Sequence, residues 1–173
     1  GFAIVVVGAT GDLLAFGHGV PPAWVRTAAA AETWAFCMVL QLNVGMPRIT
    51  TDCLSILNTL SGGAVQATAA ARPLARIWNM IYGILDGVPQ DHLGDRLIWM
   101  PAHTGMHSIS ISFRSDGVPI TALDWQANRL ADILAKAAAT GERLPPAAMR
   151  LVADAAAALE YGAALVGIVG QAA

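Results

Sequence analysis

Three acidic residues lie in otherwise apolar or small-residue surroundings. Glu32 lies in an alanine-rich segment with helical propensity, Asp52 follows the short run that ends at Thr51, and Asp132 lies in a later helical segment. Carboxylates at a strand end and on two facing helices can converge on divalent cations, because Mg²⁺ prefers oxygen ligands. Two such ions about 3.5–4 Å apart support in-line displacement at a phosphodiester. Spacing alone does not establish this site, since each acid also fits a solvated helix face or an N-cap.

The elements that must position these acids follow from the pattern of apolar residues. Short β-branched runs predict strands, and apolar residues at helical spacing predict helices. Asp124 is the expected N-cap of its helix. Helices alternate with strands, which predicts an α/β fold with a mixed sheet. The expected strands are 2–7, 13–16, 48–51, 96–100 and 108–113, and the expected helices are 27–42, 54–60, 72–85, 124–139 and one from about 147.

The composition suits one folded domain with an appended helix. Of the 173 residues, 55% are apolar and 13% are charged, and alanine supplies much of the apolar share. We therefore predict a core-forming, helix-rich chain without the roughly 20 strongly apolar residues of a membrane span. Cys37 and Cys53 form no CxxC pair, which predicts neither a disulfide framework nor a zinc site. A reducing, intracellular compartment is expected, with nucleus and cytoplasm both open.

The charge balance bears on nucleic-acid binding. The formal net charge is −2, the pI is near 6.0, and Lys136 is the only lysine. A domain that holds nucleic acid by itself usually shows a basic patch, and the sequence shows none. Low intrinsic affinity is therefore expected.

Four local motifs carry a resemblance to one enzyme family: Glu32 within its helix, Thr-Thr-Asp-Cys-Leu-Ser-Ile-Leu at 50–57, Trp-Met-Pro-Ala-His-Thr-Gly at 99–105 and Asn-Arg-Leu-Ala-Asp-Ile-Leu-Ala-Lys at 128–136. In order and context they resemble the motifs of the ribonuclease H family. The chain resembles that family over roughly residues 1–140, and the wording of the motifs is most similar to domains attached to the reverse transcriptases of retroelements. The resemblance implies that Glu32, Asp52 and Asp132 are catalytic carboxylates that bind two Mg²⁺ ions, with Mn²⁺ as a substitute. It also implies that His103 assists proton transfer or product release.

The resemblance further implies a ribonuclease H-like mixed sheet flanked by helices over 1–140, followed by a helical extension over 141–173. The family opens with a strand whose terminal Asp bridges both metals, yet no Asp precedes Asp12 here. We therefore expect a fold N-terminally truncated by one strand. Strands 2–7 and 48–51 would flank the empty slot with unpaired backbone edges. Residues 106–123 exceed the family's usual loop, and an added hairpin is expected there.

The implied activity is endonucleolytic cleavage of the RNA strand of RNA–DNA hybrids by two-metal hydrolysis. A retroelement polyprotein, with a reverse transcriptase domain on the same polypeptide, is the expected context. Without the family's first Asp, the 173-residue chain itself is expected to be inactive. The alternative is a catalytically inactive remnant that keeps the fold as a structural or docking module. A dinucleotide-binding oxidoreductase fragment, suggested by Val5–Leu13, is less favoured because the glycines and prolines of 17–22 leave too little helix after the turn.

Overall fold

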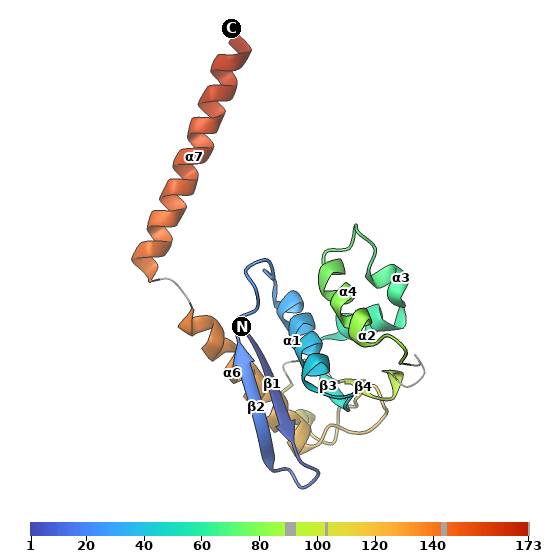
Figure 1. The fold of residues 1–173 in the computed structure, drawn as a ribbon. Helices are drawn as coiled ribbons and strands as arrows, with labels where there is room; N and C mark the ends of the chain where they lie inside the picture. The colour runs from blue at the N-terminus through green and yellow to red at the C-terminus, as the bar shows by residue number, and fades with distance from the viewer. Residues whose placement is uncertain (89–92, 103, 143–144, 173) are drawn as a thin grey trace. The chain divides into compact units, whose positions relative to one another are not determined.

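The computed structural model describes residues 1–88, 93–102, 104–142 and 145–172, with side chains described as far as residue 164 (Figure 1). Helices and short strands both contribute, so the expected α/β class is confirmed. The chain divides into two compact units, Gly1–Thr140 and Gly141–Ala173. All of the strands and all three candidate carboxylates belong to the first unit.

The strands of the described residues form two separate two-stranded sheets. β1 (Phe2–Val7) pairs antiparallel with β2 (Leu13–Gly19), and β3 (Ile49–Thr51) pairs parallel with β4 (Leu97–Trp99). The β1–β2 turn closes through the Gly8 amide, which donates to the Asp12 carbonyl at 2.8 Å. Both pairing types are present, but the expected single mixed sheet is not, because no described strand joins β1 to β3.

A single hydrophobic core lies among the helices that follow the hairpin. α1 (Ala28–Leu42) begins at Thr27, whose hydroxyl accepts from the Ala30 amide at 3.1 Å and caps the first turn. The other helices around this core are α2 (Leu54–Ser61), α3 (Ala64–Ala67) and α4 (Ala75–Ile84). The buried core residues are Ala30, Phe36, Cys37, Leu40, Cys53, Ile56, Leu60, Ala67, Ile77, Trp78, Ile81, Leu85, Leu93 and Leu97.

The segment between β4 and the next helix is folded differently from the expectation. The predicted strand 108–113 is wrong: a 3₁₀ turn, η1 (Met106–Ser108), opens the segment, and Ser110 has a positive φ of 64°. An isolated antiparallel bridge joins Phe113 to Pro119, and the Ile120 amide donates to the Ser112 carbonyl at 2.8 Å beside it. The alternating pattern that predicted a strand has no neighbouring strand to pair with, so the backbone groups bond within the segment itself. The expected hairpin is therefore present only as a short, irregular one, whose turn is closed by the Gly117 amide donating to the Arg114 carbonyl at 3.0 Å.

α6 (Ala122–Gly141) begins one turn earlier than expected, and Thr121 rather than Asp124 is its N-cap. The Asp124 amide donates to the Thr121 hydroxyl at 3.1 Å, and the Thr121 amide donates to the Asp124 carboxylate at 2.9 Å. This reciprocal pair is a capping box, with Asp124 at the third helical position. No residue of α6 is buried, although the helix is amphipathic.

The second unit is almost entirely one helix, α7 (Pro146–Ala172). Its described side chains are exposed with one exception, and they include the large apolar residues Met149, Leu151, Val152, Leu159 and Tyr161. No helix in the described part of the chain is both long enough and apolar enough to cross a membrane.

Candidate metal and nucleic-acid site

A cavity of about 1070 Å³ lies between the two sheets of the first unit. Every residue of β1 and every residue of β3 lines it, and α1 and α6 supply the remaining long walls. Figure 1 shows the β1–β2 hairpin, α1 and α6 around this region. The two strands expected to flank an empty slot therefore both line this cavity, and whether it accepts a strand stays a prediction.

α6 presents two rows of residues to the cavity, each at i, i+4 spacing. One row is small and apolar, and the other is polar. Because the apolar row faces an open cavity, its side chains stay partly exposed, which accounts for a helix without a buried residue. The apolar row is Leu123, Ala127, Ala131, Ala135 and Ala139, and the polar row is Asp124, Asn128, Asp132 and Lys136.

Asp52 is the best-anchored of the three candidate acids. It follows β3 directly, is half-buried, and its carboxylate accepts a hydrogen bond from Asn128 Nδ2 at 3.2 Å. The indole of Trp99, at the end of β4, donates to the Asp52 carbonyl oxygen at 3.2 Å. Both the backbone and the side chain of Asp52 are thereby fixed, the first by the β3–β4 sheet and the second by α6.

Glu32 projects from α1 toward the segment that follows Asp52. Burial raises the pKa of the Cys53 thiol, and a hydrogen bond to the Glu32 carboxylate raises it further. The Ser55 hydroxyl, 3.1 Å from Cys53 Sγ, acts in the opposite direction. Glu32 therefore lies beside the residue next to Asp52, and both acids line the cavity.

Asp132 lines the same cavity from α6, but its carboxylate is engaged. Lys136 Nζ lies 2.5 Å from Asp132 Oδ2, one helical turn away, and both side chains are largely exposed. An exposed pair of this kind is weak, typically about 0.3–0.5 kcal/mol. A competing cation would therefore have little to overcome at Asp132.

The three acids share a cavity without forming a preassembled ligand set. Among the described residues, no group of three or more His, Cys, Asp or Glu side chains is arranged to hold a metal ion. The donors themselves, all carboxylates, are chemically suited to Mg²⁺ or Mn²⁺. His103, the fourth expected catalytic residue, lies outside the described residues.

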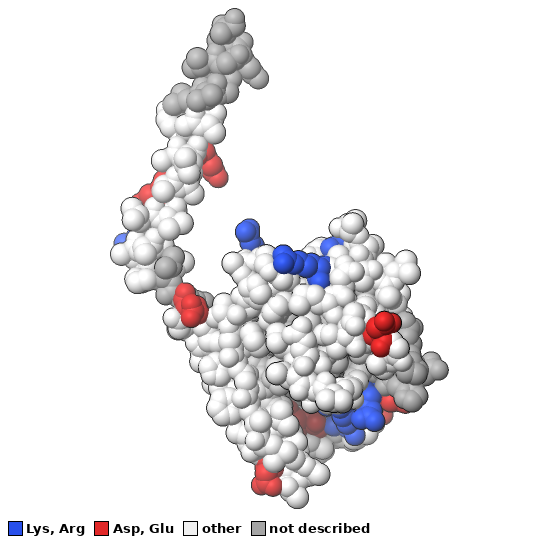
Figure 2. Space-filling view, in the orientation of Figure 1, with Lys and Arg blue, Asp and Glu red and all other residues white. Residues whose placement is uncertain are grey.

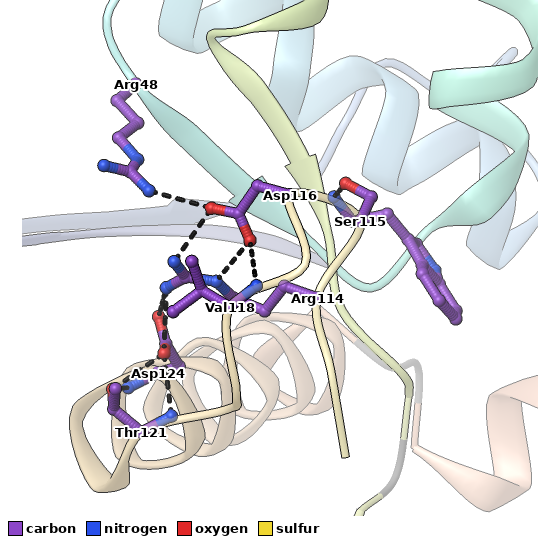
Figure 3. A network of polar contacts seen from close by, with 8 residues as sticks. Arg48, Arg114, Ser115, Asp116, Val118, Thr121 and Asp124 are labelled. Carbon is purple, nitrogen blue, oxygen red and sulfur yellow. Dashed lines mark hydrogen bonds and ion pairs between the residues drawn. The ribbon is translucent and has the colours of Figure 1, made fainter. Parts of the chain in front are cut away.

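A network of ions and hydrogen bonds fixes α6 against β3 and β4 (Figure 3). Arg114 NH1 lies 2.9 and 3.0 Å from the two carboxylate oxygens of Asp124, and Arg114 NH2 lies 2.9 Å from Asp116. Asp116 also pairs with Arg48, just before β3, at 3.0 Å. Ser115 completes the anchor, because its hydroxyl accepts from the Trp99 amide at 2.9 Å. The start of α6, and hence its polar row, is held by residues 114–116.

The charges of this network are mutually reinforcing. The hydrogen bond to Asp116 is the main reason why the pKa of Arg114 is raised. Burial acts to raise the pKa of Asp124, but hydrogen bonds from Thr121 and Arg114 outweigh it and hold that pKa below its usual value. The pKa of Asp116 is likewise lowered, because the Arg114 contact outweighs burial. All three groups are therefore charged at neutral pH.

No protein-family model matches this sequence, and neither a curated protein nor a solved structure matches it. The candidate site therefore stands on the motifs and on the geometry described above.

One alternative site is disfavoured by the fold. The Val5–Leu13 segment would need a helix directly after its glycine turn to bind a dinucleotide. Here the turn at Gly8–Asp12 leads into β2, which pairs antiparallel with β1. No helix N-terminus is available at this turn to hold a pyrophosphate.

Asn128 is a site residue that the candidate set did not include. It belongs to the same motif as Asp132 and lies four residues before it, which places both on one face of a helix. That spacing is the signal from which its place beside the acids could have been inferred. The place of Arg48 in the Arg114 network carried no comparable signal, because Arg48 is 68 positions from Asp116 and the two meet only in the folded chain.

Proposed function

We propose that this chain acts as a ribonuclease H-type endonuclease domain, which cleaves the RNA strand of RNA–DNA hybrids. The observation that carries the proposal is that Glu32, Asp52 and Asp132 come from α1, the end of β3 and α6, and line one cavity. In the ribonuclease H family, the acids of the corresponding motifs also come from a helix, a strand end and a later helix. A retroelement polyprotein containing a reverse transcriptase domain is the proposed context.

In this proposal Asp52 is the central ligand, because Asn128 already orients its carboxylate. Glu32 approaches from α1, and Asp132 joins once it exchanges Lys136 for a divalent cation. Two bound Mg²⁺ ions would supply an activated water and stabilise the charge that develops on the phosphate. The chain's own residues position the hybrid, whose A-like shape and 2′-hydroxyls distinguish it from DNA.

Cleavage of a labelled hybrid tests the proposal. The protein to use carries a designed strand of alternating apolar residues, ending in Asp-Gly, fused before Gly1, so that the cavity is filled and a fourth carboxylate is supplied. Mg²⁺-dependent, EDTA-sensitive hydrolysis is expected, and Asp52→Asn should abolish it. Asp154→Asn, on α7, is the matched control and should cleave like the parent. A folded fusion that shows no hydrolysis, or hydrolysis that survives Asp52→Asn, contradicts the proposal.

An inactive docking module is the second candidate function, and one observation favours it. The described acids are not gathered into a metal-binding group, and Asp132 is paired with Lys136. Mn²⁺ binding by the 173-residue chain separates the two. Broadening of the Asp52 and Asn128 amide resonances by Mn²⁺ supports the enzyme, whereas unchanged spectra support the docking module.

A further inference from the structure

Three arginines from two separate stretches of sequence lie where α1 and α4 begin. Arg26 directly precedes α1, and Arg72 and Arg76 lie just before and within the first turn of α4, which packs against α1. All three side chains are exposed. Figure 2 shows basic side chains gathered over this end of the first unit, with the acidic ones of that face elsewhere. We call this group, with Trp24, the arginine patch.

No ion pair within the part of the chain that the structure describes neutralises the charges of the patch. The ion pairs formed within the described residues use Arg48, Arg114 and Lys136, and none uses an arginine of the patch. Unpaired arginines on one face attract an anionic partner, and their planar guanidinium groups suit phosphate oxygens. The sequence shows no basic run, so the patch arises only from the packing of α1 on α4.

The patch also contains a stacked aromatic group. The guanidinium carbon of Arg76 lies 4.2 Å from the centroid of the Trp24 ring, and Trp34 packs edge-on against Trp24 with 5.7 Å between centroids. Trp24 itself is 36% exposed. The Arg76 guanidinium therefore lies over the Trp24 ring, and the Arg76 side chain is exposed. A fixed guanidinium plane is a surface on which an unpaired or terminal base can stack.

The patch adjoins the candidate site. Arg26 lines the same cavity as Glu32, at the end of α1 where the patch lies. A nucleic-acid strand that placed a phosphate among the three acids could continue along this wall toward Arg72 and Arg76. Stacking on Arg76 favours a nucleic acid over an acidic peptide, because a peptide carboxylate offers no ring to stack.

We infer that the arginine patch binds the phosphate backbone of a nucleic-acid strand, with one base stacked on Arg76. The inference rests on the proposed function. In it, the arginine patch is the surface along which the backbone of the hybrid leaves the acid-lined cavity. The phosphate contacts would supply affinity and would position the strand on the protein. The stacked base would add affinity that does not depend on the nucleotide sequence.

Fluorescence anisotropy of a short labelled RNA–DNA hybrid, measured in EDTA over a range of salt concentrations, tests the inference. The combined Arg26→Ala, Arg72→Ala and Arg76→Ala variant should bind at least about 100-fold more weakly and lower the salt slope by about 2 to 3. Arg96→Ala, an exposed arginine before β4, is the matched control and should bind like the parent. Arg76→Lys should keep the salt slope but weaken binding about fivefold or more, because it retains charge and loses the stack.

Two outcomes overturn the inference: the triple variant binds like Arg96→Ala, or poly-glutamate displaces the hybrid as effectively as unlabelled hybrid does. Circular dichroism of each variant shows whether the fold is retained, and single-arginine variants replace the triple variant if it unfolds. EDTA removes the metal chemistry from this assay. A failure of hybrid cleavage therefore counts against the proposed enzyme alone, and a failure of EDTA binding counts against the patch alone.

Discussion

Asn128 Nδ2 lies 3.2 Å from Asp52 Oδ2, which joins the middle of α6 to the end of β3 across 76 positions of sequence. This contact sets how far α6 lies from the sheet and in which direction the Asp52 carboxylate points. It therefore makes Asn128 the positioning residue of the candidate site.

Replacing Asn128 by Ala should weaken both the fold and the site. The unfolding free energy is expected to fall by about 0.5–1.5 kcal/mol, because one hydrogen bond to a half-buried carboxylate is lost. Urea unfolding measures this, and Mn²⁺ affinity of the same variant should fall with it. Gln126→Ala, an exposed change on the same helix, is the control. Unchanged Mn²⁺ affinity in Asn128→Ala would show that the amide does not orient Asp52.

Removing Lys136 should have opposite effects on stability and on metal binding. Lys136→Ala is expected to cost no more than about 0.5 kcal/mol, since the pair with Asp132 is largely exposed. Mn²⁺ affinity should rise, because Asp132 no longer has to exchange a bound cation. Asp132→Asn in the same background should cancel the gain. If Lys136→Ala leaves Mn²⁺ affinity unchanged, Asp132 is not a ligand.

The Arg114 network should be the most costly polar feature to break. Arg114→Ala leaves Asp116 and Asp124 without their shared partner, and a loss of about 2–4 kcal/mol is expected. Arg48→Ala is the internal control: its side chain is 61% exposed, so removing it should cost less than about 1 kcal/mol. Equal losses in the two variants would contradict the central role given to Arg114.

The same network predicts a dependence of stability on pH. The pKa values of Asp116 and Asp124 are lowered from their usual 3.8 in the folded chain. Their contribution to stability is therefore complete above pH 3.8 and is lost as the pH falls through the lowered values. Denaturant unfolding at pH values from about 2 to about 6 should show that the free energy of unfolding of the parent falls steeply as the pH is lowered. That loss should be smaller in Arg114→Ala.

The cavity between β1 and β3 should accept a strand. A fused strand of about ten residues would gain backbone hydrogen bonds worth about 0.5–1.5 kcal/mol each at the two open edges. This gain is a large share of a total stability of about 5–15 kcal/mol, so the fused chain should unfold at a higher temperature and over a narrower range. Mg²⁺ should raise the unfolding temperature further only when the strand ends in Asp. A scrambled, proline-containing fusion is the control. If the unfused chain melts as sharply and as high, the slot is not a strand site.

The secondary structure was predictable wherever local pattern and tertiary packing agreed. The apolar residues of α4 recur at helical spacing, and Ile77, Trp78 and Ile81 are indeed buried. The segment 108–113 shows the limit of this reasoning. Its alternation is typical of a half-buried strand, but a strand needs a partner edge, and no local pattern states whether one exists.

The sequence indicated which acids could share one region, whereas their role as metal ligands stays a prediction. Glu32, Asp52 and Asp132 line one cavity, as their motifs suggested, but the pairing of Asp132 with Lys136 followed from i, i+4 spacing and was not foreseen. The arginine patch was not predictable, because Arg26 and Arg76 are neighbours only through the packing of α1 on α4.

The position of the hydrophobic core in the sequence affects the order of folding and the local opening of the native state. The main cluster falls between Ala30 and Leu97, and Met100 and Ile120 are buried outside it, so one continuous stretch can form most of the core before the hairpin and α6 have docked. Early folding should therefore involve local contacts, and the hairpin and α6 should join late. In the native state, amide hydrogens of β1, β2 and α6 should exchange through local opening, whereas those of α1 and α4 should require global unfolding. The acids on α6 would then meet Asp52 and Glu32 last, so the site is completed by the least protected part of the chain.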